Sequence, residues 1–169
     1  GVMGRSGTPI GSWFMNEADL LLVFGSSFSD HTGIYEGAPT IQVATDPMRL
    51  AKRHPVTVPV MGDVAVTADL LKAEMERGGA AAIDLRGEVA ERWKLWRTEK
   101  DSRVGEDRGK GVSAAALFEA LTKAAPTDAI LPVDVGNNTY SFGRYFEPTG
   151  EQRVLMSGYL GSIGFSFPA

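Results

Sequence analysis

The sequence predicts an α/β protein with two separate parallel sheets. Three observations indicate this fold: short continuous apolar runs typical of strands buried on both faces, helical segments that alternate with them, and a polar stretch that separates two such patterns. The chain has 169 residues, 43% of them hydrophobic, which is enough for one domain or two small ones. We expect residues 1–77 and 113–169 to form the two α/β parts and residues 78–112 to link them.

The first part is expected to contain a helix, three strands and a second helix. Thr8 and Pro9 suit the start of a helix that runs towards Asn16. Asp63 is expected to cap a helix that Gly78 and the glycine after it terminate. Because strands of a complete sheet are missing and the first residue is not methionine, we expect the chain to begin partway through a domain. The expected strands are residues 20–24, 40–43 and 56–60, and the second helix is residues 64–76.

The second part repeats the alternation after the linker. Val89, Trp93 and Trp96 fall at helical spacing, so one face of a linker helix is expected to dock on a neighbouring domain. Ser113 suits the cap of a helix that ends before Pro126. The expected strands are residues 129–135 and 153–156.

Composition excludes several functional classes. The formal net charge of −4 removes the electrostatic basis for broad nucleic-acid binding. With no cysteine, the chain has no thiol nucleophile, disulfide or thiolate metal site. The longest apolar run, residues 18–24, is far shorter than the roughly 20 residues of a membrane span. These features favour a small-molecule partner.

A glycine-rich segment, residues 158–164, follows the last expected strand and precedes an expected helix. Glycines let the main chain approach a ligand closely, and amides at a helix N-terminus favour an anion such as a phosphate. The spacing differs from the G-x-G-x-x-G fingerprint of dinucleotide-binding proteins. Glycine-rich turns also serve tight packing, so both interpretations stay open.

Residues 134–138 lie at the carboxyl end of an expected parallel strand, the edge at which open α/β sheets bind ligands. The side chains of Asn137 and Asn138 are able to donate hydrogen bonds to phosphate oxygens. The same residues also suit an Asx turn that satisfies its own backbone. Asp134 equally suits an inward-facing position with a structural partner.

One loop contains the residue types of a hydrolytic triad: Ser26, Ser27, Ser29, Asp30 and His31. Triads assemble from separated segments around a sharply held nucleophile, and no G-x-S-x-G elbow occurs here. We therefore interpret the loop as solvated. His54, between charged Lys52 and Arg53 and a proline, is interpreted as a surface residue.

Several segments occur in a characteristic order along the first part: residues 1–4, 16–22, 25–30, 41–43, 46–47 and 62–64. In this order they resemble the central domain of the acetolactate synthase and pyruvate oxidase superfamily of thiamine diphosphate enzymes. Residues 134–138 and 157–165 resemble the opening of that family's diphosphate-binding domain. The resemblance implies part of a Rossmann-like central domain followed by the first part of a thiamine diphosphate-binding α/β domain.

The same resemblance implies roles at the cofactor. The Gly161 carbonyl and the Ile163 amide would hydrogen-bond the aminopyrimidine ring, and the Ile163 side chain would wedge the two cofactor rings apart. Gly136, Asn137 and Asn138 would lie against the diphosphate. We expect no catalytic or metal-binding residue within this chain, because the family's metal motif should follow Ala169 and its activating glutamate belongs to a preceding domain. The expected cofactor-binding residues are Gly136, Asn137, Asn138, Gly161, Ser162 and Ile163.

The activity implied is decarboxylation and carboligation of a 2-keto acid, as a lyase or transferase, with thiamine diphosphate and Mg²⁺. We expect this chain to be an inactive fragment of such an enzyme. The whole protein is expected to be a cytoplasmic homo-oligomer that binds neither nucleic acid nor a membrane.

The alternative function is a non-catalytic Rossmann-like module that binds FAD or ADP, or a purely structural domain, since some family members hold FAD in the central domain. A ribose-binding acid would be expected directly after the strand that ends at Val43. Ala44 and Thr45 stand there, and the first acid is Asp46. FAD is therefore disfavoured, although the alternative stays open.

Overall fold

A computed structural model of the chain describes residues 3–26, 28–29, 31–106 and 109–168. The chain forms two compact units. The three-strand unit consists of residues 12–88, and the two-strand unit combines residues 1–11 with residues 89–169. The boundaries between them fall within α1 (Pro9–Glu17) and α3 (Arg86–Val104). The predicted division into domains at residues 77 and 112 concerns family architecture and stays a prediction.

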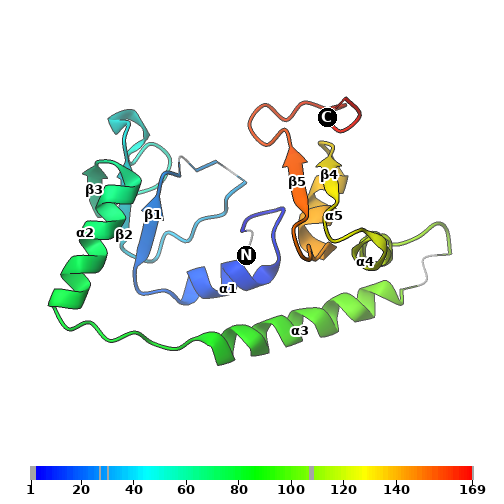
Figure 1. The fold of residues 1–169 in the computed structure, drawn as a ribbon, viewed down its shortest axis with the longest axis horizontal. Coiled ribbons are helices and arrows are strands. Elements are labelled where there is room, and N and C mark those ends of the chain that lie inside the picture. Colours follow the sequence, from blue (N-terminus) through cyan, green and yellow to red (C-terminus); the bar gives the residue numbers. More distant parts are fainter. Residues whose placement is uncertain (1–2, 27, 30, 107–108, 169) are drawn as a thin grey trace. The chain divides into compact units, whose positions relative to one another are not determined.

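The three-strand unit contains a parallel sheet in the order β1-β2-β3 (Figure 1). Leu21 lies opposite Thr40, and Ile41 lies opposite Val58. All three expected strands are therefore confirmed, as is their parallel pairing. The strands are β1 (Leu21–Phe24), β2 (Thr40–Ala44) and β3 (Val58–Met61).

Burial in this sheet is concentrated on β2, the middle strand. Val43 and Ala44 are each 2% exposed, whereas Leu22 of β1 is 44% exposed. The expectation that residues 20–24 are buried on both faces is therefore wrong. An edge strand has a neighbour on one side only, and within this unit α2 (Val64–Arg77) lies along one side of the sheet (Figure 1).

The start and the end of α2 follow from local chemistry. The Asp63 carboxylate accepts hydrogen bonds from the amides of Ala65, at 2.9 Å, and Val66, at 3.0 Å. A cap of this kind contributes about 1 kcal/mol to helix stability. Gly78 ends the helix, and the next residue, Gly79, has a φ of 68°. The expected cap and the expected terminator are both confirmed.

A buried glutamine, Gln42 on β2, joins two loops at the carboxyl end of the sheet. It is 1% exposed, and its Nε2 donates to the carbonyls of Ser26, at 3.0 Å, and Arg49, at 3.3 Å. Its Oε1 accepts from the Ala51 amide at 2.9 Å. Because every polar atom of the amide has a partner, its burial avoids the cost of an unsatisfied group. The sequence did not predict that Gln42 joins these loops, because the residue lies within an apolar run.

His54 is buried, with 3% of its surface exposed, so its interpretation as a surface residue is wrong. Its Nε2 lies 3.1 Å from the Thr40 hydroxyl, which also reaches the Ala38 carbonyl at 3.3 Å. The Phe28 ring meets the imidazole edge-on, with 5.7 Å between the ring centroids. Charged neighbours along the chain are exposed themselves, but they do not determine where the imidazole ring points.

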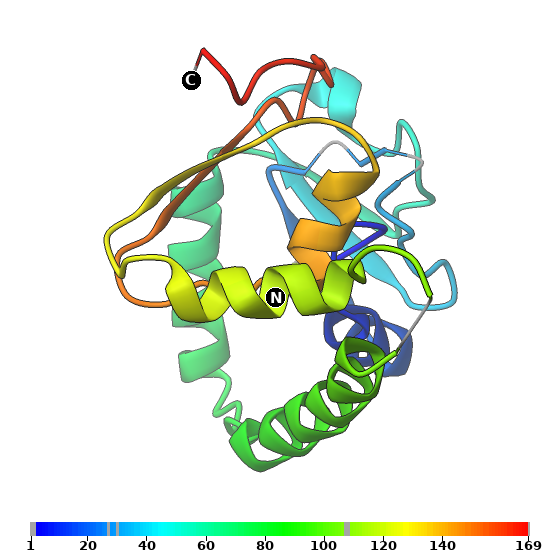
Figure 2. The same ribbon diagram turned by 90° about the vertical axis from the view of Figure 1, so that its right-hand side faces the viewer.

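The two-strand unit contains a second parallel sheet, β4 (Ile130–Val133) with β5 (Arg153–Met156). Helices α4 (Ala114–Ala124) and α5 (Asn137–Tyr145) pack against each other (Figure 2). The two sheets are separate, as the sequence predicts, and the Ser113 hydroxyl caps α4 as expected. The core of this unit consists of Val133, Phe142 and Phe146, with Phe118, Leu121 and Leu131 against it.

Helix α3 contributes a tryptophan to the two-strand unit. Trp96 is 2% exposed and stacks on Tyr145 at 6.0 Å between ring centroids. The Arg103 guanidinium donates to the Tyr145 hydroxyl at 2.9 Å. Trp93 is half-buried, whereas Val89 is 37% exposed. The C-terminal half of α3 therefore makes the closer contact with α5.

A buried ion cluster, which we call the Lys100 cluster, joins α3 to α4 and to the segment after α5. Lys100 is 3% exposed. Its Nζ lies 2.6 Å from a Glu119 carboxylate oxygen and 3.0 Å from one of Glu147. Arg97 pairs with Glu147 at 3.0 Å, and Lys123 pairs with Glu119 at 3.1 Å.

The charged groups of the Lys100 cluster stabilise one another in their ionised forms. Burial works against the charged lysine, but hydrogen bonds to Glu119 and Glu147 outweigh this cost and raise the pKa of Lys100. Hydrogen bonds from Lys100 and Lys123 lower the pKa of Glu119. Both shifts favour the charged forms, so the cluster is ionised at neutral pH.

Within the described residues, no helix combines the length and the apolar character that a membrane span requires.

Candidate functional site

Two predicted segments meet at the carboxyl edge of the second sheet. Because Val133 lies opposite Met156 in a parallel pair, residues 134–138 and 157–164 leave the sheet at the same edge (Figure 1). They also bond directly, since the Gly164 amide donates to the Asp134 carboxylate at 2.8 Å. The tertiary structure thus brings together the predicted diphosphate segment and the predicted aminopyrimidine segment.

The first segment ends in the N-terminus of α5, which has no side-chain cap. Gly136 occupies the cap position with a φ of 147°, and a Cβ atom there would lie 2.9 Å from the Asn138 side-chain oxygen. Glycine is therefore favoured by the backbone conformation, while the close Asn138 side chain is exposed and could move aside. By contrast, Asp63 caps α2 and Ser113 caps α4. The Thr139 amide donates to the Gly136 carbonyl at 3.1 Å, so the amides of Asn137 and Asn138 are the ones left for another partner, and the helix dipole favours an anion there.

The two asparagines differ in availability. Asn138 Nδ2 donates to the Asp134 carbonyl at 3.1 Å, so this side chain satisfies local backbone, although by a different bond from that of an Asx turn, in which Oδ1 accepts from the amide two residues on. The Asn137 side chain is exposed and has no hydrogen bond to any other residue that the structure describes. Of the two, Asn137 is the one able to donate to a ligand without breaking an existing bond.

The glycine-rich segment is a turn with exposed apolar side chains. Its amides bond back to Ser157: the Gly161 amide donates to the carbonyl at 3.0 Å, and the Ser162 amide to the hydroxyl at 3.3 Å. Gly161 has a φ of 63°, the left-handed region that favours glycine. Ile163 is 82% exposed and Leu160 is 80% exposed. Close packing within this chain therefore does not account for these side chains.

The helix expected after this segment is not formed. Residues 163–168 are consecutive turns in the part of the chain that is described. The Gly164 φ of 92° departs from helical backbone, and the Asp134 carboxylate holds the Gly164 amide. A long-range bond at this position replaces the intrahelical bonds that the sequence pattern suggested.

Asp134 is the charged residue of the first segment, and its carboxylate bonds to the second. Hydrogen bonds from the amides of Val135 and Gly164 lower the pKa of Asp134. It is therefore a carboxylate at neutral pH, and charge-assisted bonds of this kind are stronger than neutral ones. The sequence showed that Asp134 follows a strand, but no local signal joins it to a residue so distant along the chain.

The described serine hydroxyls of this loop bond to residues close in sequence. Ser27 and Asp30 lie outside the described residues. The Ser26 hydroxyl accepts from the Phe28 amide at 3.3 Å, and His31 is exposed. Among the described residues, no group of three or more His, Asp or Glu side chains is arranged to hold a metal ion.

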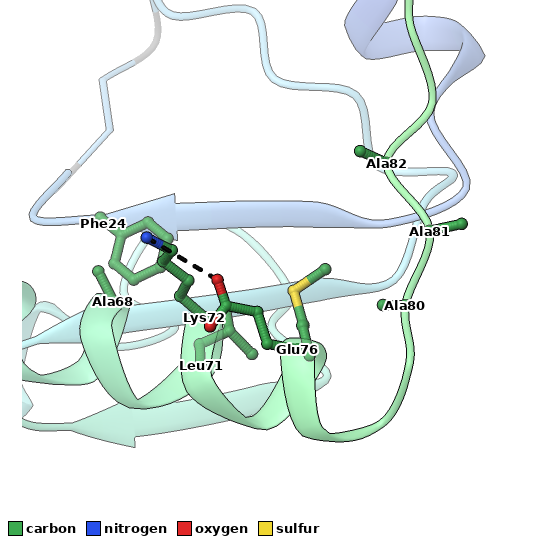
Figure 3. A pocket seen from close by; sticks show the side chains of 9 residues that line it. Phe24, Ala68, Leu71, Lys72, Glu76, Ala80, Ala81 and Ala82 are labelled. Atoms are coloured by element: carbon green, nitrogen blue, oxygen red, sulfur yellow. Dashed lines mark ion pairs between the residues drawn. The ribbon is translucent and has the colours of Figure 1, made fainter.

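A separate cavity of about 350 Å³ lies in the three-strand unit (Figure 3). Phe24 of β1 and Leu71 of α2 contribute apolar surface, and residues 80–82 close one side. Lys72 pairs with Glu76 at 3.9 Å on the exposed surface of α2. None of the predicted cofactor-binding residues lines this cavity, so we do not assign it to the cofactor.

Comparison with known proteins shows two similarities. Residues 1–71 match the family model described as thiamine pyrophosphate enzyme, central domain; thiamine pyrophosphate is another name for thiamine diphosphate. The whole chain aligns with the putative thiamine pyrophosphate-containing protein YdaP of Bacillus subtilis, with 31% identity over 99% of this chain and 29% of that protein. Residues 1–71 thus match the central domain of thiamine diphosphate enzymes, and the whole chain is similar to a protein described as containing this cofactor.

Other proteins align over the same extent. The acetolactate synthase isozyme 3 large subunit of Escherichia coli is 24% identical over 100% of this chain and 30% of that protein. Sulfoacetaldehyde acetyltransferase of Roseovarius nubinhibens is also 24% identical, over 100% of this chain and 32% of that protein. The chain therefore spans about 30% of the length of the relatives it matches.

Proposed function

We propose that residues 134–138 and 161–164 form part of the thiamine diphosphate site of an enzyme that decarboxylates a 2-keto acid and transfers the remaining fragment. The observation that carries this proposal is the uncapped N-terminus of α5 beside a turn that presents Ile163. The match to the central domain of thiamine diphosphate enzymes supports the cofactor. The names of the relatives, a synthase and an acetyltransferase, support a transfer reaction.

The chemistry of the two segments suits the two ends of the cofactor. The open amides of α5 and the Asn137 side chain offer hydrogen-bond donors to a diphosphate. The Gly161 carbonyl and the exposed Ile163 side chain offer a polar and an apolar contact to aromatic rings. When bound, thiamine diphosphate supplies the carbon nucleophile for 2-keto acid chemistry, while the protein supplies orientation.

Other parts of the whole protein complete the proposal. The described residues include no cluster suited to a metal ion, so we assign no Mg²⁺ ligand to them. We also propose that the whole protein acts on a 2-keto acid and is a cytoplasmic homo-oligomer. No observation favours FAD: the Asp46 carboxylate is used locally, where it accepts from the Met48 amide at 2.9 Å.

Asn137→Ala in the whole protein is expected to weaken thiamine diphosphate binding about tenfold, because it removes one hydrogen bond to a charged group. Its free energy of unfolding should change little, since the side chain is exposed. Isothermal titration with thiamine diphosphate and Mg²⁺ measures the dissociation constant. Asn16→Ala, at an exposed asparagine of α1, is the control. Equal affinity of Asn137→Ala and the unmodified protein would contradict this role, and no binding by the unmodified protein would refute the proposed function.

This chain on its own is expected to show no 2-keto acid decarboxylation and only weak cofactor binding. The Ile163 side chain is 82% exposed, so the turn here encloses no cofactor. Without other segments, the diphosphate charge would be countered only by amides and asparagine. A titration of the purified chain with thiamine diphosphate and Mg²⁺, beside a decarboxylation assay, tests this. Micromolar metal-dependent binding or measurable turnover would contradict it.

A further inference from the structure

One residue, Asp134, makes hydrogen bonds to both halves of the candidate site. Its backbone carbonyl accepts from the Asn138 side chain, at 3.1 Å, and from the Thr139 hydroxyl, both in the first turn of α5. Its carboxylate Oδ1 accepts from the amides of Val135 and Gly164, each at 2.8 Å. Asp134 therefore touches the start of the helix and the end of the glycine-rich turn.

The glycine-rich turn has few other supports within its unit. Ser157 holds its first half through the Gly161 and Ser162 amides, which are close in sequence. The apolar side chains of Leu160 and Ile163 are exposed and contribute little packing. The bond between Asp134 and Gly164 ties the second half of this turn to the end of β4. Without the carboxylate, the segment that carries Ile163 gains conformational freedom.

We propose that Asp134 is a positioning residue that holds the glycine-rich turn, and with it Ile163, at a set distance from the N-terminus of α5. This inference rests on the proposed function, because only a ligand that spans both segments makes their spacing important. A turn that is ordered before binding loses less conformational entropy when the cofactor binds. Asp134 thereby raises cofactor affinity through the turn and does not itself need to contact the cofactor.

The test uses the whole protein with Asp134→Ala and Asp134→Asn. We expect Asp134→Ala to raise the dissociation constant for thiamine diphosphate about tenfold. We expect faster hydrogen–deuterium exchange in the peptide covering residues 157–168, measured without cofactor. Asp134→Asn keeps an oxygen acceptor and loses only the charge, so its dissociation constant should rise only about threefold. If Asp134→Ala does not fold, the smaller effects of Asp134→Asn on exchange and affinity decide the question.

Thr122→Val is the matched control. The Thr122 hydroxyl donates to the Phe118 carbonyl at 2.8 Å and accepts from the Glu147 amide at 3.1 Å, in the same unit but away from the turn. It should leave both cofactor affinity and exchange at residues 157–168 unchanged. Unchanged exchange in the Asp134 variants, or unchanged affinity beside a binding-competent unmodified protein, would overturn the inference. An unmodified protein that does not bind thiamine diphosphate refutes the proposed function instead, and the inference falls with it.

Discussion

Ile163→Ala in the whole protein is expected to lower turnover per folded molecule on the order of tenfold or more, equivalent to at least about 1.4 kcal/mol of activation free energy. The proposed role of the side chain is to press on the bound cofactor between its two rings. Alanine is too short for that contact, so the cofactor would lose its reactive geometry. Turnover at saturating substrate and cofactor, normalised to the folded fraction, measures the effect.

Stability separates this role from that of an ordinary core residue. A buried isoleucine truncated to alanine costs roughly 2–5 kcal/mol. Ile163 is 82% exposed, so we expect this chain's free energy of unfolding to change by less than about 0.5 kcal/mol. Thermal or urea unfolding of the variant provides the comparison.

Leu160→Ala is the matched control for Ile163→Ala. Leu160 lies in the same turn, is 80% exposed and has a similar apolar volume, but it is not assigned a cofactor contact. It should therefore affect turnover much less than Ile163→Ala does. If the two variants lose turnover equally, or if Ile163→Ala keeps full activity per folded molecule, the wedge role is wrong.

Lys100→Met is expected to lower the free energy of unfolding by about 3 kcal/mol, because it removes the buried cation and leaves each carboxylate only its more exposed partner, Arg97 or Lys123. Lys100 is 3% exposed and pairs with Glu119 and Glu147. Methionine fills most of the lysine volume, so the loss reflects charge rather than a cavity. Urea unfolding followed by tryptophan fluorescence is a suitable measurement, because Trp96 lies one helical turn away on α3.

Lys94→Met makes the same chemical change at an exposed position of α3 and should cost less than about 0.5 kcal/mol. Adding Glu119→Gln and Glu147→Gln to Lys100→Met should recover part of the lost stability, because it removes the two carboxylates that have lost Lys100. A loss equal to that of Lys94→Met would mean that the Lys100 cluster contributes nothing to stability. Failure of the triple variant to recover any stability would indicate that packing of the lysine stem dominates.

The strands and helix caps could be predicted because their signals are local. Asp63 and Ser113 cap helices through amides two or three residues away, so composition at the helix start was enough. Apolar runs predicted the strands for the same reason. The aspartate after β4 was also predicted to lie at a ligand edge, since open α/β sheets bind ligands at the carboxyl ends of their strands. The glycines after β5 were predicted to allow close approach of the main chain to a ligand, with tight packing as the open alternative.

Apart from the helix expected after the glycine-rich segment, which is not formed, the errors and omissions concern side-chain surroundings. His54 was interpreted from its charged neighbours, yet its ring is buried against Thr40. Strand β1 was expected to be buried on both faces, yet its position at the sheet edge leaves Leu22 exposed. Lys100 gave no signal, because a lysine on a charged helix is usually solvated.

The sequence by itself determined the α/β class, the positions of the strands, the helix caps and the two segments of the candidate site. Each of these depends on residues within a turn or a strand of one another. Only the tertiary structure decided that Asp134 joins those segments through Gly164, and that Lys100 is buried between Glu119 and Glu147. These contacts link residues far apart along the chain. Their partners depend on how strands and helices pack, and no periodicity or local composition encodes that choice.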